Sequence, residues 1–150
     1  MRKVTLIISV FLNLFLIYFF VFRGNVTKNK KDNRIVINLT KNNADFALTE
    51  MREFLESVSA IQEGITTNNP TLIINAGKKS GGSVIAHAPK GMMASLPMGF
   101  KKLGFSVHGL FDEIAEDASN SFSKPNTEKK LNTLLKKCIA CHRTYKINTK

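Results

Sequence analysis

Both cysteines of this chain lie beside a histidine near its C-terminus, in the order Cys138-Ile139-Ala140-Cys141-His142. The spacing C-x-x-C-H is typical of covalent haem attachment. Residues three and four positions apart share one face of a helix, so the two thiols and the imidazole project to the same side. The thiols would then face the two vinyl groups of a haem, and the imidazole would face its iron. The motif therefore predicts a covalently bound haem c.

Three other uses of these cysteines stay open but fit less well. A structural zinc site needs four nitrogen or sulfur ligands, and His87 and His108 lack the paired spacing of a zinc finger. A thioredoxin-like C-x-x-C opens a helix near a βαβ unit, whereas this motif closes an expected helix. A disulfide between cysteines three residues apart would close no useful loop. Two cysteines also exclude a disulfide-stapled scaffold.

Four segments are predicted to form amphipathic helices, because apolar residues recur in each of them every three or four positions. These helices would position the motif. The expected helices cover about residues 43–64, 69–81, 95–118 and 127–145, with loops at 83–95 and 119–126. Asn69-Pro70 is a typical helix start, with an N-cap followed by proline. In the last segment the stripe of the motif continues through Leu131, Leu134, Leu135 and Tyr145. The pattern predicts an all-α fold, an antiparallel four-helix bundle over residues 43–150 with the motif facing its interior.

The N-terminal segment Val4–Phe22 holds 19 uncharged residues. As a helix it would span roughly 28 Å, about the hydrocarbon thickness of a bilayer. Met1-Arg2-Lys3 before it also suits a signal peptide, but no A-x-A-like cleavage site follows. We therefore expect residues 1–23 to form an uncleaved membrane anchor, with a cleaved signal and a soluble protein as the alternative.

The segment 24–42 is expected to form a tether and an extended lead-in to the bundle. Residues 24–33 are polar and basic, and 34–40 alternate apolar and polar side chains like a short strand. Because no second strand is evident to pair with it, this stretch is expected only to pack Ile35 or Val36, and Leu39, on the domain.

The composition limits the classes of function. A chain of 150 residues with 43% hydrophobic residues suits one folded domain and excludes disorder for most of its length. Its net charge of +11 suits nucleic acid, anionic lipid or an acidic protein partner, and charge alone does not choose among them.

The motif and its surroundings resemble the class II c-type cytochromes, the family that includes cytochrome c prime. Residues 138–146 match the family pattern C-x-x-C-H-x-x-Y-[RK] throughout, and the resemblance covers about residues 43–147. It implies a four-helix bundle in which Cys138 and Cys141 form thioether bonds to the haem and His142 is the proximal iron ligand. The membrane anchor departs from the typical soluble periplasmic member.

The resemblance also implies a compartment, because haem is attached to this motif outside the bacterial cytoplasm. The domain is therefore expected on the periplasmic side of the inner membrane, although Arg23, Lys28, Lys30 and Lys31 after the apolar span would by themselves favour the cytoplasm. This topology places the domain across the membrane from DNA and excludes nucleic acid as its partner.

Met51 is the expected sixth ligand of the iron, because low-spin relatives carry a methionine on the first helix. It lies on the apolar stripe in the N-terminal half of that helix, which in an antiparallel bundle lies beside the C-terminal half of the fourth. Arg52 and Lys146 are candidate partners of the haem propionates. The other methionines and histidines are expected to pack in the core or lie in loops: Met92, Met93, Met98, His87 and His108.

These observations favour a non-enzymatic, membrane-tethered electron carrier with a His/Met-ligated haem. The alternative is a five-coordinate protein of the cytochrome c prime type that binds nitric oxide or carbon monoxide. The expected partners are an acidic redox protein and the membrane, through residues 4–22, and a homodimer is compatible with the sequence.

Overall fold

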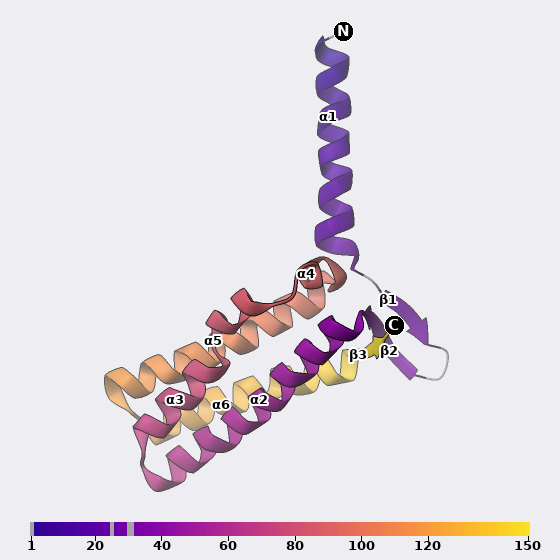
Figure 1. Ribbon diagram of the computed structural model, residues 1–150. Coiled ribbons are helices and arrows are strands. Elements are labelled where there is room, and N and C mark those ends of the chain that lie inside the picture. The colour runs from indigo at the N-terminus through magenta and orange to yellow at the C-terminus, as the bar shows by residue number, and fades with distance from the viewer. Residues whose placement is uncertain (1, 25, 30–31) are drawn as a thin grey trace.

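The computed structural model describes residues 2–24, 26–29 and 32–150, and the protein is mostly helical (Figure 1). The first helix, α1 (Arg2–Ile17), stands away from the remaining elements and continues into a wider π-helical segment, η1 (Tyr18–Arg23), which contacts the body of the domain. The stretch Lys3–Phe20 is long and apolar enough to cross a membrane, and none of it is buried inside the protein. The expected N-terminal apolar helix is therefore confirmed, with the dimensions of a membrane span or a signal sequence.

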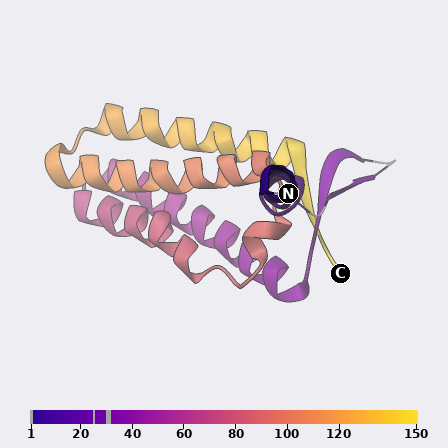
Figure 2. The ribbon, with the colours of Figure 1, turned by 90° about the horizontal axis from the view of Figure 1, so that it is seen from above.

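Four longer helices form the body of the domain (Figures 1 and 2). They are α2 (Lys41–Thr67), α3 (Pro70–Ser80), α5 (Met98–Ser121) and α6 (Lys124–Thr144). The expected loop between α3 and α5 contains two short elements instead, the 3₁₀-helix η2 (Gly82–His87) and the one-turn helix α4 (Met92–Ser95).

Side-chain caps fix the starts of two of these helices. The Asn69 side chain accepts a hydrogen bond from the Leu72 N–H at 3.2 Å, which confirms the predicted helix start. The Thr40 hydroxyl accepts from the Asn43 N–H at 3.4 Å and starts α2. Asn68 ends α2 in the left-handed region, with φ 57°, a conformation that asparagine adopts more readily than most residues.

One hydrophobic cluster joins all four helices. Its buried members are Ile61, Ile65, Ile73, Ala76, Val107, Phe111, Ile114, Ala118, Leu131 and Leu134. Close approach of α3 to α5 depends on Gly77, because a Cβ at this position would come within 2.6 Å of the Phe111 carbonyl oxygen. The apolar stripes seen in the sequence thus meet in a shared core.

A three-stranded sheet at one end of the helices was not predicted. Strands β1 (Val26–Asn29) and β2 (Asp32–Leu39) are antiparallel, and β3 (Tyr145–Thr149) pairs with β2 in parallel, with Ile37 opposite Ile147. A second buried cluster, which includes Ile37, Leu39, Ala44, Ala47, Met92 and Leu96, lies under it. The sheet thereby connects the start of α2 to the end of α6.

The sheet corrects two expectations. The stretch 34–40 was expected to have no strand partner, but it is the central strand of the sheet. Tyr145 was expected to continue the fourth helix, but it is the first residue of β3. The expected packing of the lead-in is confirmed, because Val36 and Leu39 are buried. Within the predicted tether, Asn25, Lys30 and Lys31 lie outside the described residues.

Candidate functional site

The C-x-x-C-H residues occupy the last turns of α6. Both cysteines are free and partly buried, and His142 is exposed. Cys138 packs against the main hydrophobic cluster. Cys141 and His142 instead line a pocket of about 170 Å³, here called the motif pocket. Its walls are formed by Arg34, Leu48, Met51, Phe100, Cys141, His142, Tyr145, Lys146 and Ile147.

Met51 reaches this pocket because the sheet aligns two distant parts of the chain. β2 leads directly into α2, and β3 continues directly from α6. Since β2 and β3 are parallel and paired, the start of α2 and the end of α6 are held at the same end of the domain (Figure 1). Met51 thus shares a pocket with Cys141 and His142, as does the aromatic ring of Tyr145.

Several apolar side chains of α2 and α6 remain exposed. These two helices meet at fewer points than α2 and α3, α3 and α5, or α5 and α6. On α2, Leu48 and Leu55 lie seven residues apart and share a face, and Leu135, Ile139 and His142 share a face of α6. The exposed fractions are 40% for Leu48, 70% for Leu55, 39% for Leu135 and 50% for Ile139. Such an apolar strip on a helix pair is typical of a surface that binds something.

Burial sets the protonation of the two thiols. It raises the pKa of Cys138, and it raises the pKa of Cys141 to about 11, with the nearby Cys138 adding to the effect. Both sulfurs therefore stay protonated at neutral pH. A redox-active C-x-x-C of the thioredoxin type depends on a lowered thiol pKa, so this environment disfavours that use. It suits a neutral sulfur, such as a thioether.

Three charged residues form the edge of the motif pocket near the sheet. Arg34 and Lys146, both of which line the pocket, contact the carboxylate of Asp32 at 2.7 Å and 3.4 Å. Hydrogen bonds from Arg34 hold the pKa of Asp32 well below its usual range. Arg34 also donates a hydrogen bond to the His142 carbonyl oxygen at 3.5 Å.

The two cations predicted to flank the site have different positions. Lys146 lines the motif pocket, whereas Arg52 lies outside it on the outer face of α2 and donates to the Thr49 hydroxyl at 2.8 Å. Sequence reasoning missed Arg34, which has no helical periodicity to mark it. Only the pairing of β2 with β3 brings Arg34 next to the motif.

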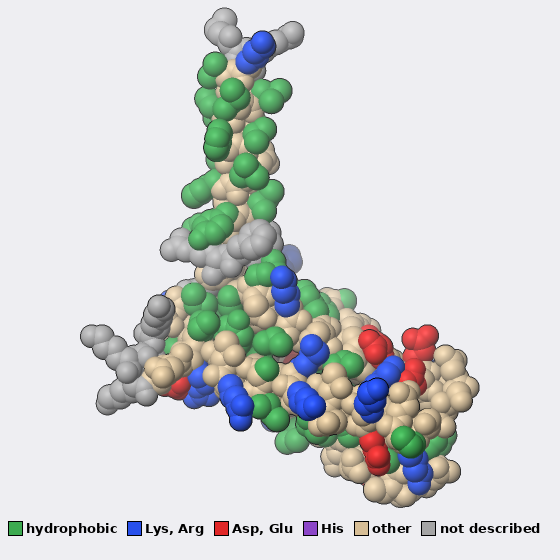
Figure 3. All heavy atoms as spheres, turned by 180° about the vertical axis from the view of Figure 1, so that it is seen from behind, with side chains coloured by type: hydrophobic (Ala, Val, Ile, Leu, Met, Phe, Trp, Pro, Cys, Tyr) green, Lys and Arg blue, Asp and Glu red, His purple; other side chains and the backbone are tan. Residues whose placement is uncertain are grey.

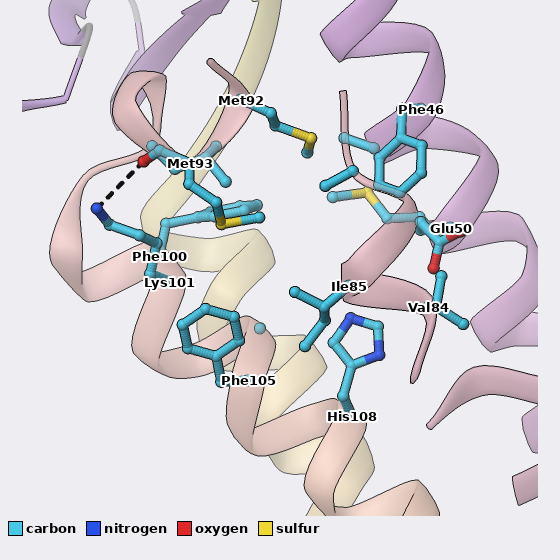
Figure 4. A pocket seen from close by; sticks show the side chains of 15 residues that line it. Phe46, Glu50, Val84, Ile85, Met92, Met93, Phe100, Lys101, Phe105 and His108 are labelled. Carbon is cyan, nitrogen blue, oxygen red and sulfur yellow. Dashed lines mark hydrogen bonds between the residues drawn. The ribbon is translucent and has the colours of Figure 1, made fainter. Parts of the chain in front are cut away.

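A second pocket, of about 90 Å³, lies between α2 and α5 under η2 and α4 (Figure 4). Met51 and Phe100 line both pockets. Met92, Met93 and His108 line only this second pocket. His87 and Met98 line neither pocket. Met92 is buried, as expected for core packing, whereas His87, expected in a loop, ends the 3₁₀-helix η2.

Comparisons with known proteins found no relative of this chain. Neither a scan against protein-family models nor searches of curated proteins and of solved structures found a match to this chain. Among the described residues, no three histidine, cysteine, aspartate or glutamate side chains gather closely enough to hold a metal ion. A haem does not require such a group, since it brings four nitrogen ligands of its own.

Proposed function

We propose that this protein is a c-type cytochrome that carries electrons through a single covalently bound haem, in an antiparallel four-helix bundle similar to that of the class II cytochromes. The observation that carries the proposal is the motif pocket, which combines Cys141 and His142 of the C-x-x-C-H motif with Met51 from a different helix. The C-x-x-C-H spacing is typical of thioether attachment, and Met51 would be a second side chain able to hold the iron.

The residues around the motif fit a haem in their chemistry. The partly buried, protonated thiols suit conversion to thioethers, because a thioether carries no charge into an apolar site. The exposed Leu48, Ile139 and Leu135 offer an apolar surface beside the motif. When bound, the haem would supply one-electron oxidation and reduction of its iron.

Each polar residue then has a distinct role. His142 would hold the iron through its imidazole, and Met51 would close the opposite position with a neutral sulfur. Arg34 and Lys146 at the rim would pair with the propionates, in competition with Asp32. A closed sixth position leaves no place for a substrate, which favours electron transfer over catalysis.

A five-coordinate, gas-binding protein is the second candidate, and one observation favours it. Because Met51 lines both pockets, its flexible side chain has room on the side away from His142. A Met51 that points into the second pocket would leave the sixth position free for nitric oxide or carbon monoxide.

The surroundings of the domain complete the proposal. We place it on the periplasmic side of the bacterial inner membrane, held by α1. Residues 64–111 contain five lysines and no acidic residue. In Figure 3, lysine and arginine side chains are spread over the domain face below the apolar helix, while most of the acidic side chains in view lie toward its far end. This charge distribution would steer an acidic redox partner.

One experiment tests the proposal directly. The purified full-length protein is extracted with acid and acetone, and its absorption spectrum is recorded in both oxidation states. We expect the haem to stay on the protein and both spectra to be low-spin. Free extraction of the haem, or zinc in its place, would refute covalent haem. A high-spin spectrum with ready binding of carbon monoxide would instead select the gas-binding candidate.

A further inference from the structure

The second pocket has apolar walls that the proposed haem site does not explain. Six of its 15 lining residues are phenylalanines or methionines (Figure 4). They are Phe46, Phe100, Phe105, Met51, Met92 and Met93. Flat rings pack well on such side chains, because aromatic pairs and sulfur–aromatic contacts both add to simple apolar burial.

Glu50 places an acceptor without a partner in this apolar surface. Its Oε2 atom is fully buried, and within the described part of the chain no hydrogen-bond donor reaches it. Burial and the neighbouring Glu53 raise the pKa of Glu50, while His108 and His87 oppose that change. A buried carboxyl oxygen without a donor is costly, so a ligand that supplies a donor would gain binding energy here.

His108 presents a second acceptor to the same pocket. Its Nδ1 atom lies 2.8 Å from the Ser80 carbonyl oxygen. A carbonyl can only accept, so Nδ1 carries the proton and, in the neutral ring, Nε2 is left as an acceptor. The ring of Phe54 packs edge-on against His108 and holds its orientation. Figure 4 shows Glu50 on α2 and His108 on α5 directed into the same space.

We propose that the second pocket binds a small, uncharged aromatic molecule with a hydroxyl group, of the phenol class. The ring would lie among the phenylalanine and methionine side chains, and the hydroxyl would donate to Glu50 or to Nε2 of His108. An ammonium ligand fits less well, because Lys101 also lines the pocket. The pocket uses none of the C-x-x-C-H residues but shares Met51 with the motif pocket, so Met92 and Met93 are the residues that report on it independently of haem.

The size of the pocket sets how far the ligand enters. A dry cavity of about 150 Å³ holds a benzene ring. The second pocket measures about 90 Å³. It therefore takes the hydroxyl end of a single ring, with the opposite edge at its mouth, and the flexible methionines adjust around it.

The test uses full-length protein in detergent micelles, with ¹³C-labelled methionine methyl groups followed by NMR. Phenol is titrated, with toluene and an alkylammonium of similar size as comparisons. We expect phenol to shift the methyl signals of Met51, Met92 and Met93. The signal of Met98, which does not line the pocket, should stay unchanged as an internal control.

Two variants identify the acceptors. Glu50→Met removes the carboxyl group but keeps its length, and it should weaken phenol binding by about tenfold or more while toluene binds as well or better. His108→Phe is the second variant and preserves a ring against Phe54. The matched control is Glu53→Met, which removes one negative charge from the same helix outside the pocket.

Three results would overturn the proposal. The first is the absence of phenol-induced shifts in the three pocket methionines. The second is equal binding of phenol and toluene that neither Glu50→Met nor His108→Phe changes, which would leave only an apolar cavity. The third is tighter binding of the alkylammonium than of phenol, which would mean that the pocket binds cations rather than phenols.

Discussion

Met51 and His142 line one pocket, although they come from the first and the last long helices of the domain. Their meeting follows from the parallel pairing of β2 with β3, which holds the start of one helix beside the end of the other. The structure thus brings to one pocket the two side chains that a His/Met-ligated iron would need.

Replacement of Met51 by leucine tests the sixth ligand. Leucine keeps the apolar volume but has no sulfur, so we expect the methionine–iron charge-transfer band of the oxidised protein to vanish and the iron to become high-spin. Absorption spectra at the red edge measure this change. Met93→Leu is the control, since Met93 lines only the second pocket, and it should keep the band. A band that survives in Met51→Leu would remove Met51 from the site.

The cysteines can be tested one at a time. Either Cys138→Ala or Cys141→Ala leaves one thioether bond, so the haem should still resist extraction with acid and acetone. The double variant should lose it. Mass spectrometry of the intact chain reads the outcome as the presence or absence of the added haem mass. Resistance to extraction in the double variant would mean that another group holds the haem.

A substitution at Ile37 tests how much the packing of the sheet contributes to the stability of the domain. Ile37 is fully buried, and Ile37→Ala should lower the free energy of unfolding by about 2–5 kcal/mol. Val26→Ala is the matched control on the neighbouring strand, because Val26 is 40% exposed and its truncation should cost about 0.5 kcal/mol or less. Urea unfolding measures both. Equal effects of the two variants would contradict the packing of β2.

Asp32 gives the domain a defined response to acid. Its pKa in the folded protein lies well below the ordinary value of 3.8, so its ion pairs stabilise the fold above about pH 4. That stabilisation is lost as the pH falls further and Asp32 takes up a proton. The difference in stability between the wild type and Asp32→Asn should therefore be present at pH 7 and shrink below pH 4. Thermal unfolding at several pH values measures the difference, and a constant difference would exclude this role.

The N-terminal segment distinguishes an anchor from a signal peptide. We expect fractionation to find the full-length protein in membranes, with the domain accessible to protease from the periplasmic side. Deletion of residues 2–23 should abolish both the membrane association and the exposure of the domain to periplasmic protease, because export and anchoring depend on the same apolar helix. A soluble mature form that begins near Gly24 would show that the segment is cleaved.

Local sequence patterns predicted the helices of this protein, but they did not reveal the pairing of strands that lie far apart in the chain. Apolar periodicity placed all four helices, and Asn69-Pro70 marked a real helix start. Tyr145, the first residue of β3, was expected to be helical because it continues the stripe of α6, and the rest of the strand was not predicted. Its strand partner lies more than a hundred residues away, and no local pattern records such a pairing.

Some residues of the candidate site could also be predicted from local sequence patterns, and others could not. The C-x-x-C-H spacing identified its residues on α6, and the stripe of the first helix identified Met51. The roles of Arg34 and Glu50 escaped detection, since each depends on what surrounds it. Arg34 becomes part of the site through the sheet, and Glu50 becomes unusual only because no donor reaches its buried oxygen among the described residues.

The parallel pairing of β2 and β3 also imposes an order on biosynthesis. At about 5–20 residues per second, β2 waits roughly 5 to 20 s for its partner to be translated. Until then one edge of β2 has no strand beside it and is open to mispairing with other chains. The end of α6 is translated immediately before β3, so the thiols of Cys138 and Cys141 would be most accessible to a haem-attaching enzyme after translation and before the sheet closes. Slow closure would then serve maturation, and premature closure would compete with it.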